Sequence, residues 1–334
     1  MTRDASQNST IVRNQASATA MRLVRAGVQV AFAVSDDLGS AVAEKLFTSP
    51  RRYERPERER VTLARARPFE IDVELTAPRW RGRPRARVAA WRWGFGPTVL
   101  LVHGWAGRGA QLGELVEPLC EAGLSVVAFD APAHGDSPGS RLYLTDLADC
   151  IAGAVAAAGP IAAIVAHSFG GAATLLALAR ARRAAAAGLP HGWPERVVAI
   201  APNAIILDAF SKYASMVGLD AAELAAFERR LAENSGLAAG EVSLDALVDG
   251  GHGELLVLHD RDDRDVPVSH GERLAAAWPG AELVTTAGLG HTRILRDPAT
   301  IARAVTFVRA GIAPPASDLV REVERLAAAD RDHA

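Results

Sequence analysis

The spacing of apolar residues predicts alternating strands and helices through the middle of the chain. Short runs of consecutive apolar residues are typical of strands buried on both faces of a parallel sheet. Longer stretches between them carry apolar residues at helical spacing. This order predicts an α/β fold, in which helices cover both faces of the sheet. The predicted strands lie at 98–102, 125–129, 161–166, 196–200, 254–258 and 281–285, and the helices at 111–121, 145–158, 169–187, 269–278 and 298–310.

A different pattern precedes these repeats. Apolar residues at positions 69, 71, 73 and 75 alternate with Glu, Asp, Glu and Thr. Strict alternation predicts a strand with one buried face and one charged face. A turn at 81–84 leads into a second strand at 85–93. With this hairpin the predicted sheet has eight strands, most of them parallel.

Three segments lie outside the predicted core, which spans 61–201 and 251–312. Residues 1–60 are predicted to be a disordered start (1–16), two helices within 17–47 and an Arg/Glu/Pro linker at 51–60. Residues 202–250 hold helical patterns and no strand, which predicts a small helical cap inserted into the core. A last amphipathic helix is predicted within 313–334.

The helices of residues 17–47 admit two interpretations. A membrane-surface or partner helix would carry a basic polar face, which this segment lacks. Packing against the main domain is therefore the favoured interpretation, although contact with a membrane surface stays possible. The oligomeric state is left open.

Composition narrows the class of protein. The 334 residues are 49% hydrophobic and 23% charged, with a net charge of −2, which excludes a disordered chain and gives no general attraction to nucleic acid. Thirteen arginines against six acidic residues at 51–92 are interpreted as the solvated rim of the hairpin. Two cysteines cannot form a disulfide framework. No signal peptide or membrane span is expected, and we predict a cytoplasmic protein.

The candidate catalytic residues lie in four loops, each directly after a predicted strand. These loops contain His103-Gly-Trp105, His167-Ser168-Phe169, the acidic segment 259–267, and Gly290-His291. Because ligands bind beyond the carboxyl ends of parallel strands, we expect these loops to converge on one site. The chain order is serine, aspartate, histidine.

This arrangement resembles the α/β-hydrolase-fold serine hydrolases, esterases and lipases among them, over residues 68 to 312. The family's nucleophile elbow, Gly-x-Ser-x-Gly, matches at Ser168 except that Ala166 replaces the first glycine. The resemblance implies an α/β-hydrolase fold, with Ser168 as nucleophile and His291 as general base. The family pattern His-Gly-x-x-Asp-x-x-Val-Pro, laid on 259–267, selects Asp263 as the acid. Asp260, Asp262 and Asp265 stay open as alternatives.

The resemblance also implies an oxyanion hole formed by the backbone N–H groups of Trp105 and Phe169. His103 is expected to hold its loop through hydrogen bonds. The segment 130–137 resembles a structural loop of the family, which leaves a catalytic role for His134 as a minor alternative.

The predicted substrate is a carboxylic ester with an apolar acyl group, hydrolysed by water through a Ser168 acyl-enzyme. Phe210, Tyr213 and Met216 recur every three residues in the cap and are candidates for the pocket lining. No cofactor or metal is expected. The alternatives are a thioesterase using the same residues, a catalytically silent scaffold that serves as a binding module, and a lipid hydrolase anchored at a membrane surface by 17–47.

Overall fold

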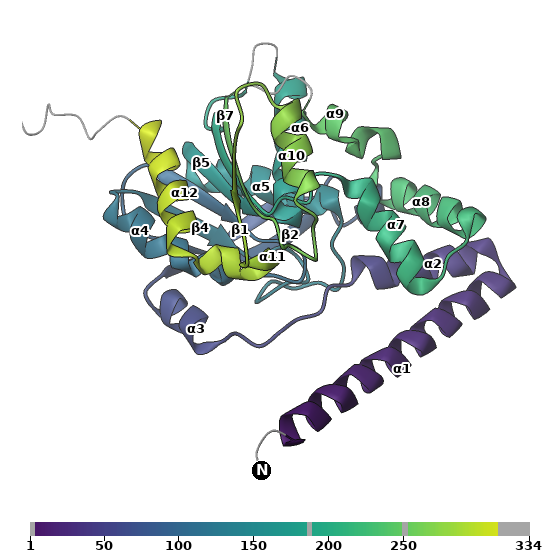
Figure 1. The fold of residues 1–334 in the computed structure, drawn as a ribbon. Helices are drawn as coiled ribbons and strands as arrows, with labels where there is room; N and C mark the ends of the chain where they lie inside the picture. The colour runs from purple at the N-terminus through teal and green to yellow at the C-terminus, as the bar shows by residue number, and fades with distance from the viewer. Residues whose placement is uncertain (1–3, 186–188, 249–252, 313–334) are drawn as a thin grey trace, which may run out of the picture.

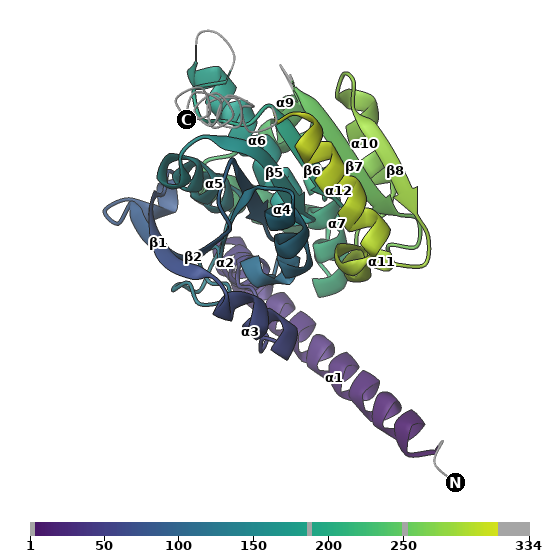
Figure 2. The same cartoon turned by 90° about the vertical axis from the view of Figure 1, so that its left-hand side faces the viewer.

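The computed structural model describes residues 4–185, 189–248 and 253–312, and these form a single eight-stranded sheet flanked by helices (Figures 1 and 2). The strand order is β1-β2-β4-β3-β5-β6-β7-β8. Only β2 runs antiparallel to its neighbours β1 and β4, and the other neighbouring strands are parallel. The predicted fold class is confirmed. The strands are β1 (Arg67–Glu74), β2 (Arg85–Trp93), β3 (Thr98–Val102), β4 (Ser125–Phe129), β5 (Ile161–His167), β6 (Arg196–Ile200), β7 (Glu254–Asp260) and β8 (Glu282–Thr286).

Two hydrophobic cores fasten the helices to opposite faces of the sheet. On one face, α5 (Leu144–Ala158), α6 (Phe169–Ala184) and α10 (Ser269–Ala277) bury leucines that include Leu147, Leu176 and Leu274. On the other face lie η2 (Gly109–Leu115), α4 (Val116–Glu121) and α12 (Pro298–Ala310), which bury Leu112, Leu119 and Phe307. The carboxyl ends of the parallel strands stay free for the loops that carry the predicted chemistry.

The edge of the sheet shows why the sequence alternates there. In β1, Ile71 and Val73 are buried while the intervening Asp72 is exposed. In contrast, β3, β4 and β6 are buried at every position, as consecutive apolar runs require.

Helices cover the carboxyl end of the sheet as a cap. α7 (Ile206–Val217), α8 (Ala221–Ser235), η3 (Ala239–Val242) and α9 (Leu244–Val248) follow β6. Asp220 begins α8 by accepting hydrogen bonds from the backbone N–H groups of Ala222 and Glu223, and the Glu223 carboxylate accepts from the Asp220 N–H in return. Gly218 and Gly236, both in the left-handed conformation, end α7 and α8.

The N-terminal segment differs from the expectation of disorder at residues 1–16 over the part that the structure describes, which begins at residue 4. α1 (Asp4–Val34) is one long helix that projects from the body, and α2 (Asp36–Thr48) turns back beside α7 and α8 (Figure 1). No proline or glycine interrupts α1 before Gly27, so nothing in the backbone prevents the helix from extending. The predicted break at Ser35 is present, since its hydroxyl caps α2 by accepting from the Leu38 N–H at 3.1 Å.

The segment expected as a linker at 51–60 is anchored to the core, and it ends in α3 (Glu57–Ala64). Arg55 forms ion pairs with Asp130 at 2.8 Å and Asp136 at 2.7 Å. Glu59 and Arg108 form a buried ion pair. The interpretation of these arginines as a solvated rim holds for Arg87, which is 63% exposed, and is wrong for Arg55. A charged side chain can be buried when an oppositely charged partner lies beside it, and the sequence alone does not show which residue is that partner.

The remaining short elements are η1 (Pro78–Trp80), α11 (Gly290–Arg293) and η4 (Ile294–Arg296). The predicted C-terminal helix within 313–334 lies outside the described residues. Among the described helices, none is long and apolar enough to cross a membrane.

Candidate active site

Ser168 stands in a sharp turn between β5 and α6. Its backbone has φ +54° and ψ −120°, a conformation that costs a non-glycine residue energy and is typical of functional positions. Backbone hydrogen bonds hold the turn: the Ser168 N–H donates to the Ile200 carbonyl at 3.0 Å, and the Ser168 carbonyl accepts from Gly171 N–H and Asn203 N–H. Hydrogen bonds to both its N–H and its carbonyl therefore hold Ser168 in this strained conformation.

The residues around the turn are small because other backbone passes close by. A Cβ on Gly170 would lie 2.6 Å from the His103 carbonyl oxygen and 2.8 Å from that of Val102. Ala166, which replaces the glycine of the family pattern, is fully buried in β5 between Val102 and Ala199. Its methyl group is accommodated there without interrupting the sheet.

His291 links the serine to a carboxylate. Its Nε2 lies 2.9 Å from Ser168 Oγ, and its Nδ1 lies 2.7 Å from Asp263 Oδ2. Because a carboxylate can only accept, Nδ1 donates to Asp263, and Nε2 is free to accept the serine hydroxyl proton. The structure thus brings together Ser168, His291 and Asp263, in the geometry that activates a serine.

Asp263 is held as an anion by several donors. Its Oδ1 accepts the N–H groups of Asp265 and Val266, both at 2.9 Å. Burial on its own would raise the pKa of this carboxyl. Hydrogen bonds from His259, His291 and the Val266 N–H outweigh burial and hold the pKa well below its usual range.

The three alternative aspartates occupy other positions, and of these Asp265 lines the cavity beside His291. Asp260 accepts four hydrogen bonds, from Thr286 Oγ1 and from the N–H groups of Asp262, Leu289 and Gly290, and so fastens the loop that carries the histidine. Asp262 accepts from the Gly288 N–H at 2.7 Å. The carboxylates of Asp260 and Asp262 therefore bond the backbone of the histidine loop, whereas Asp263 bonds the His291 ring.

The loop after β3 lies against Ser168. A Cβ on Gly104 would meet the Ser168 Cβ at 2.9 Å. The Trp105 ring packs edge-on against Phe169 at 5.7 Å between centroids. The N–H of Phe169 stands at the start of α6 and so has no partner within the helix. The two residues predicted for the oxyanion hole therefore lie on neighbouring loops beside Ser168.

Two buried histidines hold these loops in place. His103 Nδ1 donates to the Gly104 carbonyl at 2.7 Å, and its Nε2 accepts from the Ala131 N–H at 2.9 Å. His134 donates to the Pro132 carbonyl and accepts from the Ala106 N–H. Burial lowers the pKa of His103 to about 4 and that of His134 to about 3. Both rings use both nitrogens for backbone contacts.

A third histidine, His167, contributes a contact that was not predicted from the sequence. Its Nε2 donates to the backbone carbonyl of His291 at 2.9 Å, and the two rings lie 4.7 Å apart. Burial lowers the pKa of His167 to about 3, so the ring is neutral. His167 therefore holds the histidine loop against the serine elbow. Its place beside Ser168 is the only signal of this role that the sequence carries.

Ser168 and His291 open into a cavity of about 1060 Å³ between the sheet and the cap. The three pocket residues proposed from the sequence all line it: Phe210 and Tyr213 are buried, and Met216 is half exposed. Leu142, Tyr143 and Leu144 line it from the start of α5, and the end of α2 contributes Leu46, Phe47 and Thr48. The contribution of α2 was not expected, because the segment is distant in sequence from every predicted site residue.

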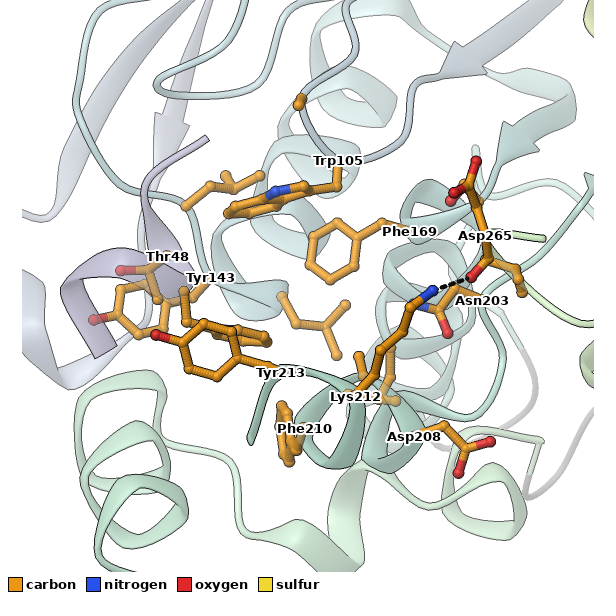
Figure 3. A pocket seen from close by; sticks show the side chains of 18 of the residues that line it. Thr48, Trp105, Tyr143, Phe169, Asn203, Asp208, Phe210, Lys212, Tyr213 and Asp265 are labelled. Carbon is orange, nitrogen blue, oxygen red and sulfur yellow. Dashed lines mark hydrogen bonds between the residues drawn. The ribbon is translucent and has the colours of Figure 1, made fainter. Parts of the chain in front are cut away.

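Charged side chains gather at another part of the cavity. Figure 3 shows Lys212, Asp208, Asp265 and Asn203 on one side, and Thr48, Tyr143 and Tyr213 on the other. Lys212 Nζ donates to the Asp265 carbonyl at 2.9 Å, which ties the cap to the loop at 259–267. Asp263, Asp265 and His291 place possible metal-ligand atoms within 4.8 Å of one another. Both nitrogens of His291 are already engaged with Asp263 and Ser168, however, so a metal there would displace the triad contacts.

Comparison with known proteins places this geometry in a family. Among solved structures, the fold is similar to an esterase from Pyrococcus furiosus (TM-score 0.55, 17% identity, covering 78% of this chain and 98% of that one). It is also similar to an esterase from Exiguobacterium antarcticum (TM-score 0.52, 14% identity, 72% and 100%). No curated protein matches the sequence closely enough to count as a relative. A model of the alpha/beta hydrolase family matches residues 99–304, and because this match covers more than half of the 334 residues, the chain belongs to that family.

Proposed function

We propose that the protein is a serine hydrolase that cleaves a carboxylic ester of an apolar acyl group through a Ser168 acyl-enzyme. The observation that carries the proposal is the continuous hydrogen-bonded chain from Ser168 Oγ through His291 to Asp263, with distances of 2.9 and 2.7 Å. Ser168 and His291 face a cavity with aromatic walls, which favours an apolar acyl group.

In the proposed reaction, Ser168 Oγ attacks the ester carbonyl while His291 Nε2 takes the hydroxyl proton. Asp263 stabilises the imidazolium that forms. The N–H groups of Trp105 and Phe169 donate to the oxygen that becomes negative, at the positive end of the α6 dipole in the case of Phe169. His291 then gives its proton to the leaving alcohol. In the second half of the reaction His291 Nε2 takes a proton from water, which attacks the acyl carbonyl, and returns that proton to Ser168 Oγ as the acid is released.

Labelling with a fluorophosphonate tests the proposal, because this reagent reacts with an activated serine and not with an ordinary surface serine. We expect labelling of the native protein and its loss in Ser168→Ala. Ser211→Ala is a matched control, since Ser211 is an exposed serine of α7 that does not line the cavity. A folded native protein that is not labelled, or labelling that persists in Ser168→Ala, would contradict the mechanism. Screening p-nitrophenyl esters against the corresponding thioesters then separates an esterase from a thioesterase.

A further inference from the structure

The substrate cavity has a wall outside the segment that matches the hydrolase family. The family match begins at residue 99, whereas Phe47 and Thr48, at the end of α2, line the same cavity as Ser168 and His291. The N-terminal segment therefore has a place in the site that its position in the sequence does not suggest.

Phe47 belongs to an aromatic cluster shared with the cap. Its ring packs edge-on against Phe210 at 5.7 Å and against Phe227 at 5.4 Å, and it lies 5.0 Å from the ring of Tyr213. Phe210 and Tyr213 line the cavity beside Phe47, while Phe227 is fully buried behind them. The apolar end of the cavity is thus formed jointly by α2 and α7.

Buried polar contacts hold α2 in this position. The Tyr213 hydroxyl donates to the Ala43 carbonyl at 2.7 Å. The Glu44 carboxylate, which is 1% exposed, accepts from the Tyr143 hydroxyl at 2.8 Å and from Asn234 Nδ2 at 2.6 Å. Glu44 also lies 3.3 Å from Arg230 Nε. These contacts join α2 to the cap and to the core at once, so the wall is built into the fold.

Polar and aromatic side chains line opposite sides of the cavity. Lys212, Asp208 and Asp265 make one side hydrophilic, and the side with Tyr143, Tyr213 and the end of α2 is aromatic (Figure 3). An apolar acyl chain attached to Ser168 loses most contact with water when it enters the aromatic side. The hydrophilic side is left for the alcohol part of the ester and for water.

We propose that Phe47 limits the length of the acyl chain and that the substrate is an ester of a medium-length or long unbranched acyl group; this rests on the function proposed above. Each methylene that enters the aromatic side of the cavity raises kcat/KM about fourfold, the equivalent of about 0.8 kcal/mol. The gain per methylene ends where the chain reaches Phe47. A larger side chain at this position shortens the accepted chain, and a smaller one lengthens it.

The test compares two variants over p-nitrophenyl esters from acetate to laurate. Relative to the native protein, Phe47→Trp should lower kcat/KM for the longest well-accepted ester by about 15-fold, the loss of roughly two methylenes. Phe47→Leu should move the end of the rise to longer chains. The change in kcat/KM should be smaller for acetate than for the long esters, because an acetyl group is too short to gain the methylene contacts of the aromatic side. A profile that is unchanged in both variants would overturn the proposal.

Phe227→Leu is the matched control, since its ring contacts Phe47 but does not line the cavity. An equal change of the profile in Phe227→Leu would mean that loosening of the cap causes the effect, and this too would overturn the proposal. A second measurement needs no turnover: calorimetric binding of decanoate to Ser168→Ala, with and without Phe47→Trp. We expect weaker binding with Phe47→Trp, and equal binding would contradict the role of Phe47 even if ester hydrolysis were absent.

Discussion

Replacing Asp263, the proposed acid, gives the sharpest test of the site, because four aspartates compete for the role within six residues. In Asp263→Asn, His291 Nδ1 loses the carboxylate that lies 2.7 Å away. Two unit charges about 4 Å apart attract each other by about 4 kcal/mol at an effective dielectric constant of about 20. That energy corresponds to about 10³ in rate. Loss of the correct histidine tautomer brings the expected decrease to about 10³ to 10⁴.

The decrease should fall on kcat, with KM nearly unchanged. The attraction between Asp263 and His291 becomes large only when the ring is positively charged, and in the proposed mechanism this happens in the transition state rather than on substrate binding. Steady-state hydrolysis of the best p-nitrophenyl ester measures both constants. Circular dichroism and denaturant unfolding of the same preparation show whether the variant is folded.

Asp260→Asn is the informative comparison, since this neighbouring carboxylate accepts four hydrogen bonds and none of them comes from the ring of His291. Three come from Thr286, Leu289 and Gly290, which lead to His291, and one comes from the Asp262 N–H of its own loop. We expect it to lower the free energy of unfolding by about 1–3 kcal/mol, because buried donors lose a charged partner. Its effect on kcat should be smaller than that of Asp263→Asn. The reasoning is refuted if Asp263→Asn keeps kcat within tenfold of the native value, or if a fully stable Asp260→Asn loses more activity than Asp263→Asn.

Two further predictions concern stability. Burial lowers the pKa of His134 to about 3, so between about pH 4 and 6 the unfolded chain binds a proton there that the folded chain does not, and stability falls as pH falls. His134→Gln should therefore reduce the slope of the free energy of unfolding against pH by up to about 1.4 kcal/mol per pH unit, measured by urea denaturation; an unchanged slope would contradict the neutral buried ring. Glu44→Ala should lower the free energy of unfolding by about 1–3 kcal/mol, because the Tyr143 hydroxyl and the Asn234 amide lose their buried acceptor. Glu233→Ala, an exposed glutamate of α8, should change it by less than about 0.5 kcal/mol in the same assay.

The strands and the neighbours of Ser168 could be predicted because their signals are local. A buried strand is a short apolar run, and β3, β4 and β6 have the predicted bounds. The turn after β5 needs small residues and a serine within five positions, and all of them are adjacent in the sequence. Parallel strands also place the ends of β5, β7 and β8 at one edge, so proximity of their loops follows from topology.

Signals that depend on a distant partner could not be found in the same way. Arg55 reads as one more surface arginine until Asp130 and Asp136 are placed beside it. Apart from its place beside Ser168, the sequence does not distinguish His167 from an ordinary buried histidine, because its acceptor is a backbone carbonyl 124 positions away. The register of the acidic loop was open for a related reason: four aspartates in one loop satisfy the same composition, and only the fold decides which one faces His291.

The end of α2 was the hardest part of the site to predict, because its partners are the most distant in the sequence. Its position also places the proposed determinant of specificity on a different segment from the proposed catalytic residues. Apolar residues at helical spacing predict that one face of α2 packs against something, but Phe210 and Phe227 lie more than 160 positions beyond Phe47. The proposed catalytic groups stand on loops of the sheet, fixed by backbone hydrogen bonds, whereas Phe47 stands on a helix that precedes the sheet in the chain. A substitution in α2 can therefore reshape the cavity without moving Ser168 or His291. If Phe47 limits chain length as proposed, the N-terminal segment and the hydrolase core can change independently, one altering which ester is accepted and the other how it is cleaved.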